Sequence, residues 1–319
     1  MGPTAVHVLA RRGDRGPWSI MSDITAGDRE PAGPPPGALV LAGIASCTIV
    51  TVAGVASRGR SVLEGMNVHF DVSADGQKVG VRDRTLIEAD ASEDDRVRFR
   101  RAADNCPVGK IFTKRLIEIE DAVSLERGSI GSSTEPRTDP PAIFTSGTVR
   151  ATWLPATAEW TEREGRRVLA QEGEVAIHIE TAAGPRRTRF GLLGGHTDAG
   201  WAPRPNPYAM SGLAASTLMT LRSEAASLGI DPASLRVEIR TMSAVPEGQK
   251  EGAQDAAAAG RPAVVRWSRR VSARAASDAR DDDVLAAMKR DPVYGYCMRG
   301  DMFTSRDVVV APPRVAALT

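Results

Sequence analysis

The sequence predicts an α+β protein made of two copies of one unit, in which a sheet wraps on a buried central helix. Three observations lead to this fold class: an internal repeat, a long uncharged stretch of helical length, and alternating apolar segments of strand length. The chain has 319 residues, which suggests two domains at about 100–200 residues each. With 42% hydrophobic and 25% charged residues, the composition excludes wholesale disorder.

The repeat consists of two blocks that recur in the same order. Residues Gly43–Thr51 align with Gly212–Thr220, and Cys106–Arg115 aligns with Cys297–Arg306. Two ordered blocks make coincidence a poor explanation. The second copy carries extra chain between its blocks, and we place this insertion at the Gly-, Ala- and Gln-rich residues 246–262, a predicted loop. The predicted boundaries are 1–126 for copy one, 127–142 for a Pro- and Gly-rich linker, and 143–319 for copy two.

The uncharged stretch allows two interpretations. Residues Ala38–Ala56 are long enough to cross a membrane, but a helix buried on all sides in protein has the same composition. The repeat favours the buried helix, because its second copy continues into Arg222 and Glu224, where a membrane span needs apolar residues. We therefore expect two core helices that form intramolecular partners, and no membrane partner.

The remaining elements follow from apolar periodicity and turn residues. For copy one we expect a hairpin at 5–10 and 18–22, a helix at 38–57, a strand at 66–72, a helix at 93–104 and a strand at 115–120. For copy two we expect strands at 148–153, 167–170, 174–181 and 187–193, a helix at 209–228, strands at 235–241 and 263–271, a helix at 281–290 and a strand at 307–311. Three consecutive acidic residues begin each of the two shorter helices, which suits the positive end of a helix dipole.

Charge, aromatic content and cysteine number exclude several function classes. The 41 basic and 40 acidic residues leave a formal net charge of +1, which argues against nucleic-acid partners, and 4% aromatic residues argue against a stacking platform. Three cysteines in no metal-ligand spacing exclude a disulfide scaffold and predict neither a metal nor a cofactor. Residues 1–20 hold no apolar leader, so we expect a cytoplasmic protein with reduced thiols.

Two cysteine motifs carry a resemblance to a known family. A turn at Gly33–Pro36 precedes the helix motif Ala45-Ser-Cys-Thr48, which ends at Thr51, and Ala102-Ala-Asp-Asn-Cys-Pro-Val108 follows. Together these residues resemble the OsmC/Ohr family of osmotically inducible and organic-hydroperoxide-resistance proteins. The resemblance covers most of residues 17–120 and, more weakly, residues 146–311.

The resemblance implies an intertwined dimer of α+β subunits with a two-cysteine site at each end of the subunit interface. Two copies in one chain would then form a pseudo-dimer within one polypeptide. The resemblance also implies that Cys47 attacks a hydroperoxide, becomes a sulfenic acid and condenses with Cys106, and that an external dithiol reduces the disulfide. Thiol chemistry agrees in kind, because a thiolate is needed to attack and a second thiol prevents over-oxidation. From the residues alone, however, the favoured interpretation of Cys47 is a small apolar residue of a packed helix.

Several residues depart from the family pattern. Copy two has Ser216 in place of the helix cysteine and keeps Cys297, so it is either a degenerate structural half or a different pocket that uses one of these residues. In copy one, Ala38 stands where the family places an acidic residue that holds an activating arginine. The candidate arginines are Arg11, Arg12 and Arg15 in the first hairpin, whose turn is equally an exposed charged tip.

Two functions therefore stay open. The first is a thiol-dependent reductase of organic hydroperoxides that uses Cys47 and Cys106. The second is a repurposed scaffold that binds or transforms a specific metabolite without peroxide chemistry, as the departures suggest. Whether the fused chain dimerises again is open as well.

Overall fold

The computed structural model describes residues 6–12, 15–23, 31–59, 61–75, 78–130, 146–163, 166–183, 186–195, 205–242 and 264–313. Below, the first half is the chain through β5 and the second half is the chain from β6 onward. In chain order the elements are β1 (Val6–Arg12), β2 (Arg15–Ser22), α1 (Pro36–Gly59), β3 (Leu63–Asp75), β4 (Lys78–Ala89), α2 (Glu93–Asp104), α3 (Pro107–Lys114), β5 (Ile117–Arg127), β6 (Gly147–Arg163), β7 (Arg166–Ala183), β8 (Arg186–Gly195), α4 (Pro205–Ser223), α5 (Ala225–Leu228), β9 (Arg236–Met242), β10 (Val265–Ala275), α7 (Asp281–Arg290), α8 (Pro292–Arg299) and β11 (Phe303–Ala311). The mixed content of helices and strands agrees with the predicted α+β class.

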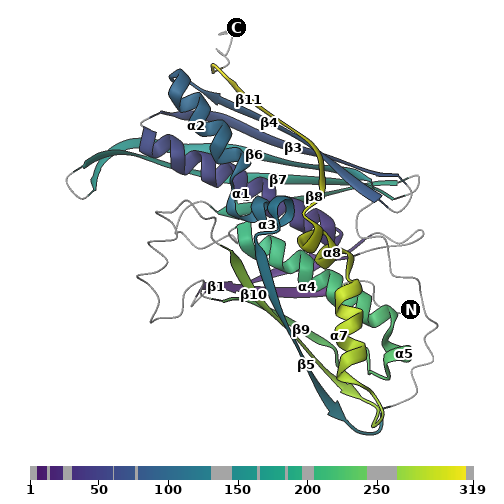
Figure 1. Cartoon of the computed structure of the whole chain (residues 1–319). Coiled ribbons are helices and arrows are strands. Elements are labelled where there is room, and N and C mark those ends of the chain that lie inside the picture. Colours follow the sequence, from purple (N-terminus) through teal and green to yellow (C-terminus); the bar gives the residue numbers. More distant parts are fainter. Residues whose placement is uncertain are drawn as a thin grey trace.

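The largest sheet takes strands from both halves of the chain. Its order is β11-β4-β3-β6-β7-β8, so β3 and β4 of the first half lie between strands of the second half. The last strand, β11, runs parallel to β4, whereas the other pairs are antiparallel. In β3 the side chains of Met66, Val68 and Phe70 alternate with polar ones and are fully buried, as the sequence predicted. This face of the sheet packs on α1 (Figure 1).

A three-stranded sheet at the other end of the molecule is shared in the same way (Figure 1). Its order is β5-β10-β9, in which β5 comes from the first half and runs parallel to β10. Apolar side chains of α4, α5, β9, β10 and α7 form the core of this end. Each half therefore contributes its closing strand to a sheet of the other half.

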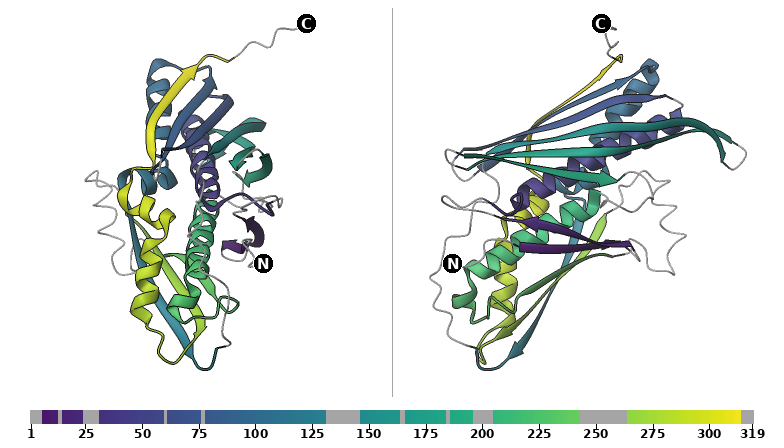
Figure 2. Two further views of the ribbon diagram at one scale, coloured as in Figure 1. Left: turned by 90° about the vertical axis from the view of Figure 1, so that its right-hand side faces the viewer. Right: turned by 180° about the vertical axis from the view of Figure 1, so that it is seen from behind.

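The helices α1 and α4 meet at the centre of the molecule, between the two larger sheets (Figure 2). Their contact is reciprocal. A Cβ atom on Gly43 would lie 2.8 Å from the backbone of Pro205 and Ala209, and one on Gly212 would lie 2.6 Å from the carbonyl oxygen of Pro36. The glycines thus allow the two backbones to touch at matching points, as at a two-fold interface.

The helix α1 passes a test of length and apolarity for a membrane span over Pro36–Arg58, yet 78% of its most apolar window is buried inside the protein. Leu39, Ile44 and Ile49, which lie on different sides of the helix, are each fully buried. Core packing accounts for the uncharged composition of the segment.

The sequence missed some elements and misplaced others. Strand β4 and the short helices α3 and α8 were not predicted, and β7 is one strand where two were expected. Strand β5 continues to Arg127, the first residue of the predicted linker. Residues 131–142 of that linker and the predicted loop at 246–262 lie outside the described residues.

Candidate functional site

The structure brings Cys47 and Cys106 together. Cys47 lies in the middle of α1, and Cys106 precedes the first turn of α3, whose first residue is Pro107. The two thiols hydrogen-bond to each other, and neither is in a disulfide. Their exposed fractions are 6% for Cys47 and 1% for Cys106, so Cys47 is the more accessible of the two.

Backbone amides at the start of α3 donate to both sulfur atoms. The amide of Gly109 donates to Sγ of Cys106 over 3.2 Å, and the amide of Val108 donates to Sγ of Cys47 over 3.4 Å. Pro107 suits this position because its ring presets the backbone angle of the first helical residue and it lacks an amide hydrogen to satisfy. The free amides of a helix N-terminus favour a negative charge, so this end of α3 suits a thiolate.

The protonation of the pair is asymmetric. The hydrogen bond from Cys47 lowers the pKa of Cys106 to about 7, against the effect of burial and with help from Thr48, Gly109 and Arg306. The same hydrogen bond, together with burial, raises the pKa of Cys47 well above its ordinary value. When the pair is singly ionised, as about half of the molecules are at pH 7, the negative charge lies on Cys106 and the proton on Cys47.

An ion pair across β4 and β11 lies beside Cys106. The Nε atom of Arg306 donates to the carboxylate of Asp83 over 2.8 Å, and its Nη2 atom donates to the carbonyl oxygen of Ala103 over 3.3 Å. Ala103 lies in the last turn of α2, just before Cys106. Burial raises the pKa of Asp83, and the charge of Arg306 opposes this effect.

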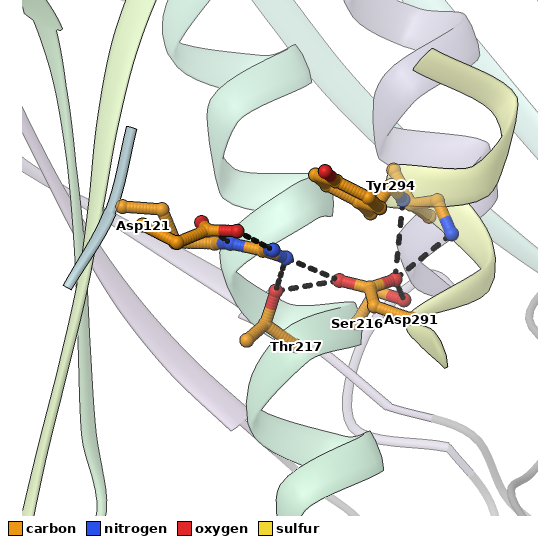
Figure 3. Close-up of polar contacts among 7 residues, drawn as sticks. Asp121, Ser216, Thr217, Asp291 and Tyr294 are labelled. Carbon is orange, nitrogen blue, oxygen red and sulfur yellow. Dashed lines mark hydrogen bonds and ion pairs between the residues drawn. The ribbon is translucent and has the colours of Figure 1, made fainter. Parts of the chain in front are cut away.

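A second polar cluster lies between α4 and the start of α8 (Figure 3). Asp291 precedes Pro292 at the first turn of α8 and is fully buried. Its carboxylate accepts hydrogen bonds from the hydroxyls of Ser216 and Thr217, both over 2.5 Å, and from the amide of Val293 over 2.8 Å. Burial raises the pKa of Asp291, while these hydrogen bonds lower it.

Arg269 completes this cluster from the neighbouring sheet. Its fully buried guanidinium donates to both oxygens of Asp121, over 2.7 and 2.9 Å, and to the Thr217 hydroxyl over 3.0 Å. It lies 3.4 Å from the Asp291 carboxylate and 4.5 Å from the ring centroid of Tyr294. Asp121 is on β5 of the first half, so the cluster joins the two halves (Figure 3).

The structure disagrees with the predicted sequence alignment of Cys297 with Cys106. Asp291, not Cys297, precedes the proline that starts the corresponding short helix, and Cys297 lies inside α8. Both short helices have eight residues and end in a left-handed cap, at Arg115 and Gly300. The alignment relied on the Cys, Gly and Phe matches within Cys297–Arg306. By position in the short helices, Asp-Pro-Val at 291–293 corresponds instead to Cys-Pro-Val at 106–108. Burial and the charge of Asp291 raise the pKa of Cys297 far above its ordinary value, so this thiol stays protonated.

Residues 27–120 match the model of a family described as OsmC-like protein. The matching segment holds α1, α3 and both cysteines of the first site. The comparisons with curated proteins and with solved structures gave no match.

Other predicted residues are placed as follows. Ala38 is fully buried in the OsmC-like segment, near the start of α1. The side chains of Arg11, Arg12 and Arg15 lie outside the described residues, while their hairpin packs on α4 through Val6. Within the described part of the chain, no three His, Cys, Asp or Glu side chains gather as a metal site requires. Sequence reasoning assigned no role to Thr48, Asp83 or Arg306: Thr48 was noted only as part of the helix motif and Arg306 only as the end of a repeat block, while Asp83 belongs to no motif.

Proposed function

We propose that this protein is a thiol-dependent reductase of organic hydroperoxides, in which Cys47 attacks and Cys106 resolves. The observation that carries the proposal is the pair of hydrogen-bonded thiols at the start of α3, each of which accepts a hydrogen bond from a backbone amide. The OsmC-like match over the same segment supports it.

The first step oxidises Cys47. Its thiol passes its proton to the Cys106 thiolate, and the resulting Cys47 thiolate attacks the distal oxygen of ROOH. The O–O bond breaks, Cys47 becomes a sulfenic acid, and RO⁻ takes up a proton to leave as ROH. Cys47 is suited to this step because it is the more accessible of the two thiols.

The second step forms the disulfide. Cys106, again a thiolate, attacks the sulfur of the Cys47 sulfenic acid, and hydroxide leaves with a proton as water. The sum is ROOH plus two thiols giving ROH, water and one disulfide. An external dithiol then reduces the disulfide by thiol–disulfide exchange and is itself oxidised.

We also propose that the chain is two diverged copies of one unit arranged as an intramolecular pseudo-dimer. The reciprocal contacts of Gly43 and Gly212, and the exchange of β5 and β11 between sheets, support this arrangement. The second copy then holds Ser216 and Asp291 where the first holds Cys47 and Cys106, so one redox centre is expected per chain.

The test is peroxide turnover by the whole chain. Reduced protein is mixed with cumene hydroperoxide and dithiothreitol, peroxide loss is followed, and peptide mass spectrometry locates disulfides. We expect turnover with a 47–106 disulfide, loss of turnover in Cys47→Ser, and a trapped sulfenic acid on Cys47 in Cys106→Ser. Cys297→Ser is the matched control and keeps full turnover.

Three outcomes overturn the proposal. Wild-type protein without peroxide turnover favours the metabolite-binding alternative, for which native mass spectrometry of the purified protein would reveal a bound small molecule. Full activity in Cys47→Ser excludes the assigned chemistry. A sulfenic acid that forms on Cys106 instead reverses the two roles.

A further inference from the structure

The last strand of the chain places one arginine beside the cysteine site. Arg306 on β11 joins two elements of the first half, because it donates both to Asp83 on β4 and to the carbonyl of Ala103 at the end of α2. Two residues, Asp104 and Asn105, separate Ala103 from Cys106. The guanidinium therefore holds the segment that carries this thiol.

We propose that Arg306 is a positioning residue for Cys106: it fixes the turn that presents the sulfur and places a positive charge beside the thiolate. This inference rests on the proposed function only in one respect, namely that the thiolate of Cys106 is the form that reacts. The hydrogen bond to Ala103 and the ion pair with Asp83 leave the side chain only 18% exposed, so the charge acts where solvent screens it little.

The second polar cluster supports this role by position. Arg306 pairs with Asp83 across β11 and β4, and Asp121 pairs with Arg269 across β5 and β10, each as directly opposite residues of a parallel strand pair. In the first pair the closing strand β11 carries the arginine, whereas in the second pair the closing strand β5 carries the aspartate. The guanidinium of Arg269 contacts Asp291, which precedes the proline of α8, and the guanidinium of Arg306 donates to the carbonyl of Ala103, three residues before Cys106.

In the second cluster the residue before the proline is Asp291, an acidic side chain that Arg269 contacts over 3.4 Å. In the first, the corresponding residue is Cys106. The positive charge of Arg306 acts on this thiol and favours its negatively charged form. The other ionisable groups near Cys106 and its arginine are Cys47 on α1, Asp83 on β4 and Asp104 on α2.

The experiment measures the thiolate directly. In the reduced full-length chain, absorbance at 240 nm is followed against pH, and the curve of the matching Cys106→Ser variant is subtracted. Arg306→Gln removes the charge, and Arg306→Lys keeps it. We expect Arg306→Gln to move the titration to higher pH and to cut the thiolate fraction at pH 7 about threefold to tenfold. Arg306→Lys should keep most of the thiolate.

Two further variants make the result decisive. Arg150→Gln removes an exposed arginine from the outer face of the large sheet and should leave the titration unchanged. Asp83→Asn/Arg306→Gln removes both charges of the pair, so it avoids a lone buried carboxylate if the single variant fails to fold. An unchanged titration in either folded variant that lacks Arg306 overturns the proposal.

The readout separates this inference from the proposed function. The thiolate titration needs no peroxide, so a shift in Arg306→Gln without wild-type peroxide turnover would reject the reductase and keep the positioning role. Turnover in the wild type with no shift would do the reverse.

Discussion

The hydroxyl of Thr48 is within donating distance of two acceptors, Sγ of Cys106 at 3.3 Å and the carbonyl oxygen of Ile44, in the preceding turn of α1, at 3.0 Å, and its one hydrogen can serve either of them. The helix that carries Cys47 thus also supplies a donor to the second thiol. Because this donor comes from a buried side chain, its removal leaves the Cys106 thiolate without a replacement from water.

We expect Thr48→Val to make Cys106 less acidic, since valine keeps the shape and loses the donor. A lost hydrogen bond to a charged group is worth about 1.5–3 kcal/mol, so disulfide formation at pH 7 should slow by about tenfold. Stopped-flow measurement of peroxide consumption checks this. Thr48→Ser keeps the hydroxyl and should retain most of the rate; equal rates for serine and valine would contradict the role of the hydroxyl.

The rate of thiol oxidation should rise with pH through about 7, where Cys106 titrates. Below this pH the pair holds two protons, and Cys47 has no thiolate to receive its proton. Initial rates measured from pH 5.5 to 8.5 should therefore increase and then level off. Cys297→Ser should give the same profile, because the buried Cys297 stays protonated over the whole range. A rate that is flat across this range would show that Cys106 does not set it.

Arg269→Met should destabilise the protein strongly. The substitution leaves Asp121 and Asp291 buried without their cation, which typically costs about 3–5 kcal/mol. Urea unfolding followed by circular dichroism measures the change. The control is Arg274→Met, which breaks an ion pair of a largely exposed arginine with Asp231 and should cost at most about 1 kcal/mol. A similar decrease in the free energy of unfolding in both variants would show that the buried cluster stabilises the protein no more than an exposed ion pair does.

Gly43→Ala should destabilise the contact between α1 and α4. The added methyl group would lie 2.8 Å from the backbone of the opposite helix, so the helices must separate, at about 1–3 kcal/mol. The matched control is Gly54→Ala in the same helix, where a Cβ atom meets nothing within 4 Å. Alanine has the better helix propensity, so Gly54→Ala should stabilise by about 0.5–1 kcal/mol. The free energy of unfolding of the two variants should therefore change in opposite directions.

Ser216→Cys/Asp291→Cys should create a second dithiol pair. The two positions are in direct hydrogen-bond contact, and Arg269 keeps its two bonds to Asp121. Mild oxidation followed by peptide mapping should find a 216–291 disulfide. In Ser216→Cys alone, a disulfide to Cys297 should be absent; its appearance would support the original alignment of Cys297 with Cys106.

The sequence was informative where a pattern repeats. The internal repeat favoured a buried helix over a membrane span for the uncharged segment, and alternation at Met66, Val68 and Phe70 indicated β3. Strand β4 escaped because Asp83 and Thr85 occupy inward positions, where they bond to each other and to Arg306. Because Asp83 forms a buried ion pair with Arg306 of β11, a polar residue occupies an inward position of β4 and interrupts the alternation of apolar residues that predicts a strand.

The site was predictable only in part. The two cysteine motifs led to Cys47 and Cys106, which lie in hydrogen-bond contact, but nothing near them in sequence points to Arg306, which comes from β11. The second cluster was misread because cysteine attracted the alignment, whereas the proline that starts α8 marks the corresponding position. Pro107 and Pro292 meet the same backbone requirement at the first residue of a helix, although a cysteine precedes the first and an aspartate the second.

The exchange of closing strands also shapes how the chain folds. Strand β4 acquires its parallel neighbour only when β11, near the end of the described chain, has been synthesised, and β5 must wait for β10. Strand pairs this distant in sequence lose the entropy of closing a large loop before their contacts stabilise the fold. We therefore expect slow folding. Until then the first half exposes unpaired strand edges, the surfaces on which nascent chains aggregate.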